Sequence, residues 1–154
     1  MKAPWSEARP GRAAAAGVVA AVVNSLAIRA VTAAGVKAGT GGLAAFSLAQ
    51  ARALGMQLPT HLGAVGQELF HIAIGVFAAL AYALLAYALL PGPRVVRALI
   101  FVQVLFLAQA LMVLPWLGKG AFGWHLGTWT PLWSFALNAV FGVVLGLLYS
   151  PSRR

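Results

Sequence analysis

The chain of 154 residues contains no cysteine and only two acidic residues, Glu7 and Glu68. The lack of cysteine excludes disulfide bonds, thiolate metal sites and cysteine nucleophiles. A di-iron helix bundle needs a glutamate from each of two helices and two Glu-x-x-His motifs, whereas this chain has one such motif, Glu68 with His71. No nucleophile–base pair and no phosphate-binding glycine loop can be assigned. We therefore expect no catalytic residues and a protein that is not an enzyme.

Charge is also scarce, because charged residues make up 8% of the chain against a usual share of about 25%. Apolar residues make up 62%, which is more than a soluble domain of this size can bury. A lipid bilayer must therefore supply the burial. The formal net charge is +9, but the basic residues punctuate the apolar runs and form no continuous stripe. We expect no nucleic-acid partner.

Four apolar runs are long enough to cross a bilayer, which takes about 20 residues. They cover residues 13–36, 69–90, 98–117 and 129–149. Arg29 interrupts the first run, close enough to its end to reach the lipid headgroups. That run exceeds the apolar region of a signal peptide, about 7–15 residues, so we expect a retained helix. The sequence predicts an all-α fold: one integral membrane domain, residues 1–154, built as a bundle of four transmembrane helices.

Lysine and arginine predict the orientation of these helices. The two termini and the turn "PGPRVVR" form one set of segments, and the two long loops form the other. The first set contains Lys2, Arg9, Arg12, Arg94, Arg97, Arg153 and Arg154, and the second contains Arg29, Lys37, Arg52 and Lys119. Basic residues favour the cytoplasmic side. We expect a multi-pass protein of a prokaryotic inner (plasma) membrane, with both termini cytoplasmic.

The two external loops have distinct compositions. Within residues 37–66 the stretch "TGGLAAFSLAQARAL" has Thr40 as a helix cap and an apolar side made by Leu43, Phe46 and Leu54. We expect a short helix lying in the membrane interface. The second loop is rich in tryptophan, a residue that favours the headgroup layer. An aromatic belt is the expected role, and a stacking site for a ligand is the alternative; the residues are Trp116, Trp124, Trp129 and Trp133.

Amide side chains interrupt the apolar runs at four positions. Because amides at this depth cannot face lipid at low cost, we expect them to form hydrogen bonds between helices. Each such bond contributes roughly 0.6–2 kcal/mol. A polar lining for a solute path is the alternative, and no carboxylate lies deep enough for a proton path. The four amides are Asn24, Gln103, Gln109 and Asn138.

Two of the predicted helices share a sequence pattern. The segment "HIAIGVFAALAY" (71–82) aligns without gaps with "NAVFGVVLGLLY" (138–149). Both contain small residues four positions apart, a spacing that lets helix backbones approach closely. The pattern predicts two helical hairpins related as a parallel repeat, with a shared packing motif without duplication as the alternative. The corresponding positions are Gly75 and Gly142, Ala79 and Gly146, His71 and Asn138, and, more faintly, Asn24 and Gln109.

These segments, together with "LPGPRVVRALIF" and "LPWLGKGAFG", resemble an uncharacterised family of small four-helix prokaryotic membrane proteins, a domain of unknown function. The resemblance covers roughly residues 62–149. In the proteins that the chain resembles, a histidine often stands where Asn138 stands here, and the second external loop is often rich in methionine and glycine. The resemblance therefore implies a fold and no activity.

The remaining polar candidates gather on the external side. Glu68 is expected to form an ion pair with Arg29 at the membrane edge, and His71 a hydrogen bond between helices. We expect neither a metal nor a cofactor. A zinc or copper site made by His61, His71 and His125 is an alternative, and a haem held by histidines would need two of them within facing spans.

Three functions are compatible with these features. We expect a non-catalytic integral membrane protein, either an accessory or structural subunit of a larger membrane complex, such as a respiratory complex, or a homo-oligomer. Its partners would be the lipid bilayer and other membrane subunits or further copies of itself. The alternatives are a subunit of a small-solute transporter or channel, and a haem- or metal-binding membrane redox protein.

Overall fold

The computed structural model describes residues 8–37 and 42–151. Within these ranges the chain forms helices and no strands. Glu7 lies outside them, as does Thr40, the expected cap of the loop helix. Three basic residues that entered the orientation prediction, Lys2, Arg153 and Arg154, also lie outside the described residues.

Four helices are long and apolar enough to cross a membrane, as the sequence predicted. The first is α1 (Pro10–Ala33), and the second is α3 (Ala64–Ala81), which continues as the π-helical turn η2 (Tyr82–Ala86). The third is α4 (Arg94–Ala108), which continues through η3 (Gln109–Val113) and α5 (Leu114–Trp116), and the fourth is α6 (Thr130–Leu148). Two shorter helices, α2 (Gly42–Ala53) and η4 (Ala121–Gly123), lie in the loops.

The first three spanning helices begin a few residues earlier than their apolar runs. An apolar run starts after the last polar residue, whereas the first turn of a helix tolerates charge and favours proline. Pro10 therefore stands in the first turn of α1, and Arg94 begins α4 directly after Pro93. The first helix also ends earlier than expected, because Gly35 (φ 85°) closes it. The N–H of Val36 then bonds to the carbonyl of Val31 at 3.2 Å, as in a Schellman motif.

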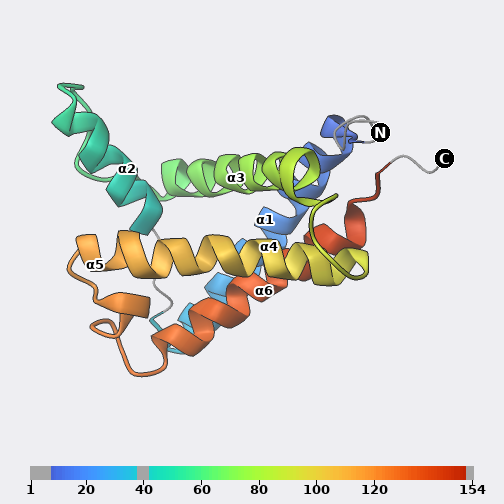
Figure 1. Ribbon diagram of the computed structural model, residues 1–154. Coiled ribbons are helices and arrows are strands. Elements are labelled where there is room, and N and C mark those ends of the chain that lie inside the picture. Colours follow the sequence, from blue (N-terminus) through green and yellow to red (C-terminus); the bar gives the residue numbers. More distant parts are fainter. Residues whose placement is uncertain (1–7, 38–41, 152–154) are drawn as a thin grey trace.

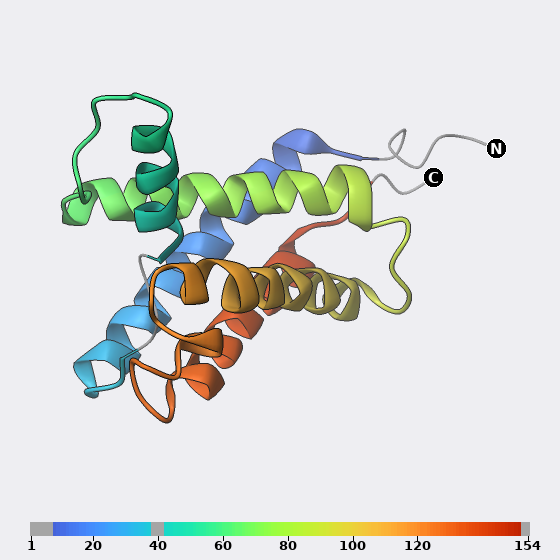
Figure 2. The same cartoon turned by 60° about the vertical axis from the view of Figure 1, so that its left-hand side comes forward.

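The four long helices pack as a row in the order α3, α1, α6, α4. Helix α1 packs closely against both α3 and α6, and α6 packs closely against α4. Helices α3 and α4 are joined by a short turn, yet they approach each other closely only near η2. Figures 1 and 2 show that this turn, the start of α1 and the end of α6 gather at one end of the bundle, with α2 and the loop after α5 at the other. We call the boundary between α3 and α4 the α3–α4 seam.

Glycines account for the two closest helix contacts. A Cβ built on Gly17 of α1 would lie 2.8 Å from the carbonyl oxygen of Gly75 on α3. A Cβ on Gly146 of α6 would lie 2.6 Å from the Cα of Val95 on α4. Only glycine allows backbones to approach so closely. The small-residue faces of α3 and α6 therefore pack against helices of the same chain, one in each hairpin. The relationship of the two hairpins as a repeat stays a prediction.

A helix does form in the long loop between α1 and α3. Helix α2 lies against the start of α3 and against η3. A Cβ on Gly42 would lie 3.2 Å from the side chain of Leu114, and the rings of Phe46 and Trp116 meet edge to face at 5.0 Å. Gly42 and Phe46 thus contact protein, whereas Leu54, the third residue of the expected apolar side with Leu43 and Phe46, is 84% exposed. The expected place of the helix in the membrane interface stays a prediction.

Candidate functional site: a pocket lined by tyrosine and arginine

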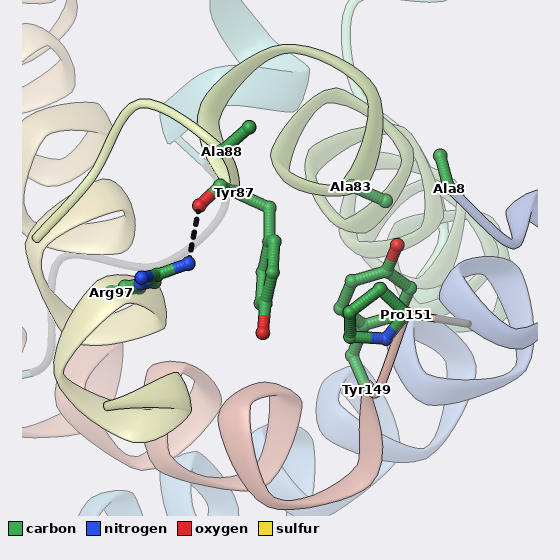
Figure 3. Close-up of a pocket in the computed structure, with 7 residues that line it drawn as sticks. All are labelled: Ala8, Ala83, Tyr87, Ala88, Arg97, Tyr149 and Pro151. Atoms are coloured by element: carbon green, nitrogen blue, oxygen red, sulfur yellow. Dashed lines mark hydrogen bonds between the residues drawn. The ribbon is translucent and has the colours of Figure 1, made fainter. Parts of the chain in front are cut away.

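A pocket opens at the end of the bundle where α1 starts and α6 ends. Its volume is about 140 Å³, several times the roughly 30 Å³ that one water occupies in the liquid. Figure 3 shows side chains from η2, from the turn before α4, from α4 and from the end of α6 around it. The lining residues are Ala8, Ala83, Tyr87, Ala88, Arg97, Tyr149 and Pro151.

Arg97 holds the turn on one side of the pocket in place. Its Nε donates a hydrogen bond to the carbonyl of Gly92 at 2.7 Å, and Nη1 donates one to the carbonyl of Tyr87 at 3.0 Å. The guanidinium also lies 4.9 Å from the centroid of the Tyr87 ring, which is within range of a cation–π interaction. The phenol of Tyr82 adds a hydrogen bond to the carbonyl of Arg94 at 3.1 Å. Four contacts thus fix the backbone that leads from η2 into α4.

Three tyrosine rings pack mutually edge to face beside the pocket. The ring centroids of Tyr82 and Tyr87 lie 5.7 Å apart, those of Tyr82 and Tyr149 5.8 Å, and those of Tyr87 and Tyr149 5.6 Å. Each such pair contributes about 0.5–1.5 kcal/mol beyond the area it buries. The alignment of the two repeated segments pairs Tyr82 with Tyr149, but it does not reveal that the rings touch. Sequence reasoning missed this cluster, because the third ring comes from the turn.

The hydroxyl of Tyr149 in this cluster is an unsatisfied hydrogen-bond donor. The residue is 1% exposed, and its hydroxyl is buried without a hydrogen-bond partner of good geometry in the described chain. Burial raises the pKa of this phenol, and the nearby backbone N–H of Arg9 opposes the rise in part. The hydroxyl therefore keeps its proton at neutral pH.

Four arginines lie at the end of the bundle that contains the pocket, and one of them, Arg97, lines it. Arg9 and Arg12 lie at the start of α1, and Arg94 and Arg97 lie in the first turn of α4, at the same end of the bundle. Among the residues that the structure describes, the one carboxylate is Glu68, at the opposite end of α3. This end of the described chain is therefore strongly electropositive.

The expected ion pair is present at the other end of the bundle. Arg29 Nη2 lies 3.0 Å from Glu68 Oε2 and joins the end of α1 to the start of α3. The side chains of Arg29 and Glu68 are 69% and 31% exposed, so the ion pair lies at the surface of the bundle.

The amide side chains do not form the expected set of bonds between helices. Gln103 bridges two helices, because its Nε2 donates to the carbonyl of Phe135 on α6 at 3.3 Å. Asn138 instead donates to the carbonyl of Ser134, one turn earlier in its own helix, at 2.9 Å. An Asn side chain is short enough to bond within its own helix. No bond is found between the side chains of Asn24, Gln109 and Asn138, and the Oδ1 atom of Asn24 is buried without a partner in the described chain.

The histidines also depart from expectation. The Nε2 atom of His71 is buried without a hydrogen-bond partner in the described ranges, so the expected bond between helices is absent. His61 lies 3.2 Å from the hydroxyl of its neighbour Thr60, and His125 Nδ1 lies 3.0 Å from the carbonyl of Gly118. No three metal-binding side chains come together among residues 8–37 and 42–151, so His61, His71 and His125 do not assemble into one site there.

Comparisons of the chain with models of protein families, with curated proteins and with solved structures found no match.

Proposed function

We propose that this chain is a non-catalytic integral membrane protein that works by packing against other membrane-spanning helices. It would serve as an accessory or structural subunit of a larger complex, or assemble with further copies of itself. The observation that carries this proposal is the open α3–α4 seam. A closed bundle of four helices has four close interfaces around its axis, whereas the described chain has three.

The seam leaves two membrane-spanning helices with only one close long neighbour each. Helix α3 exposes Phe77 (68%) and α4, through its continuation η3, exposes Met112 (71%). Because the glycine faces are already used within the chain, a partner helix would contact larger apolar side chains such as these. Van der Waals packing of this kind drives helix association in membranes.

The polar groups of the described chain support a structural role. Arg29 and Glu68 join α1 to α3, Gln103 joins α4 to α6, and Thr130 donates a 2.7 Å hydrogen bond to the carbonyl of Lys37. Each of these contacts joins two segments of the bundle. None of them pairs a nucleophile with a general base. The basic end of the bundle would lie on the cytoplasmic side of the membrane, because lysine and arginine favour that side.

Mild solubilisation of the native membrane tests the proposal. We expect the chain to migrate in a particle larger than one copy with its detergent, as measured by light scattering and native mass spectrometry. The second measurement would show whether the added mass is another protein or more of the same chain. A particle that contains one copy and no partner would contradict the proposal.

Cross-linking then locates the contact, and the chain favours this experiment because it has no cysteine. Single-cysteine variants F77C on α3 and M112C on η3 should cross-link to a partner or to a second copy in the native membrane. V19C on α1 is the matched control, because Val19 is also an exposed apolar residue (47%) but belongs to a helix with two close neighbours. Equal cross-linking of all three variants would contradict the proposal that the partner binds at the α3–α4 seam.

A second candidate function has an observation of its own. Three atoms inside the spans are buried without partners in the described chain: Asn24 Oδ1, His71 Nε2 and Gln103 Oε1. Such atoms are costly in a bilayer unless water or a polar solute reaches them. They would suit a path for small neutral solutes. Swelling assays on vesicles containing the purified protein test this, and a rate for urea or glycerol equal to that of empty vesicles would exclude it.

A further inference from the structure

The pocket between η2, the start of α4 and the end of α6 has a donor-rich lining that the packing role does not use. Its polar side chains are one guanidinium, Arg97, and two phenols, Tyr87 and Tyr149. The remaining lining side chains are alanines and a proline. Among the lining residues that the structure describes, no side chain is a carboxylate, so this lining favours a ligand that accepts hydrogen bonds and carries negative charge.

We propose that this pocket binds the phosphate-containing headgroup of an anionic phospholipid. Arg97 still has N–H donors available, because only two of them bond to the carbonyls of Gly92 and Tyr87. Arginine is well suited to phosphate, since its planar group presents parallel donors. The Tyr149 hydroxyl is fully buried and has a proton without an acceptor in the described chain.

The position of the donors favours a lipid headgroup over a free phosphate ion. In Figure 3 the ring of Tyr87 stands between Arg97 on one side and Tyr149 on the other. A headgroup such as phosphatidylglycerol has acceptors on its phosphate and on its alcohol, so one molecule can meet donors on both sides of the ring. A phosphate ion is too compact to do the same.

The surroundings of the pocket match the rest of a lipid. The pocket lies where the spanning helices end, which is the depth of the headgroups if the helices cross a bilayer. Leu85 and Leu89 precede and follow the lining residues Tyr87 and Ala88, and they are 68% and 78% exposed. These side chains offer an apolar surface for the acyl chains.

Native mass spectrometry of the full chain in detergent tests the assignment. We expect phosphatidylglycerol to be retained about tenfold better than phosphatidylcholine of the same chain length. R97Q should weaken phosphatidylglycerol binding about tenfold, and Y149F, which removes one hydroxyl, about threefold to fivefold. R94Q is the matched control, because Arg94 lies in the same helical turn and carries the same charge but does not line the pocket; its effect should stay below about twofold.

A second arm separates the two sources of phosphate. Inorganic phosphate at millimolar concentration should not displace phosphatidylglycerol, whereas displacement that depends on Arg97 and Tyr149 would identify a free ion as the ligand and overturn the lipid assignment. Equal retention of the two lipids, or a loss in R94Q as large as in R97Q, would overturn the proposal. Because R97Q also removes bonds that hold the turn, Y149F keeps the test decisive if R97Q fails to fold.

Discussion

Arg29 and Glu68 lie 39 residues apart in the chain, yet their side chains meet at 3.0 Å. The pair joins the last part of α1 to the first part of α3, on the side of the bundle opposite the tyrosine cluster. Glycine contacts hold the same two helices together deeper in the hairpin, where Gly75 meets Gly17 and Ala21. The first hairpin is thus held by charge at its exposed end and by close backbone contact in its interior.

The ion pair predicts a modest coupling between its partners. Because both side chains are partly exposed, a double-mutant cycle of R29Q and E68Q should give a coupling free energy of about 0.2–1 kcal/mol. The coupling should fall as the salt concentration rises. Unfolding in mixed micelles measures it, and a coupling above about 3 kcal/mol, or one that salt does not alter, would show that the pair is more buried than the structure indicates.

The close backbone contact at Gly146 predicts a larger change in the free energy of unfolding than the ion pair does. G146A should lower the free energy of unfolding by about 1–3 kcal/mol, because the added methyl would meet the backbone of Val95 at 2.6 Å. G11A is the control, since a Cβ on Gly11 meets nothing within 4 Å and alanine favours helix by up to about 1 kcal/mol. Both are measured by the same unfolding assay. A neutral G146A would contradict the close packing of α6 on α4.

The hydrogen bond of Thr130 allows the contribution of one hydrogen bond to stability to be measured. T130V retains the shape of the side chain but removes the hydroxyl that bonds to the carbonyl of Lys37 at 2.7 Å. Since Thr130 is 2% exposed, the loss leaves that carbonyl unsatisfied and should cost about 1–3 kcal/mol of unfolding free energy. T32V, at an exposed position near the end of α1, should change stability by less than about 0.5 kcal/mol.

The environment of Tyr149 predicts loss of stability at high pH. Burial raises the pKa of this phenol in the folded protein, so the folded state favours the protonated form. Its stabilising contribution is complete below the unfolded-state pKa of about 10 and is lost as the pH rises through the folded-state pKa. Between pH 8 and pH 11 the wild type should therefore lose more unfolding free energy than Y149F, in which this group is absent. Equal losses would show that Tyr149 titrates normally.

Composition and hydropathy determined the class of this protein and the number of its long helices. An apolar run of about 20 residues can satisfy its backbone in lipid only as a helix, so Leu69–Leu90 and Trp129–Tyr149 predict helices without tertiary information. The pairing of Arg29 with Glu68 was also predictable, because Glu68 has no competing carboxylate nearby and α1 ends on the same side. Exact helix ends were not predictable from hydropathy, since the first turn of a helix can be polar.

Only the tertiary structure decided which neighbours each side chain meets. Glycine lets α1 approach α3 and lets α6 approach α4, and Gly17 has no hydropathy signal that marks it as the partner of Gly75. Asn138 and His71 were expected to bond between helices, but the short Asn side chain reaches its own backbone and His71 finds no acceptor within the described chain. The pocket was equally hidden. Tyr87, Arg97 and Tyr149 belong to three separate segments, and only the folding of helix ends against one another gathers their donors around one cavity.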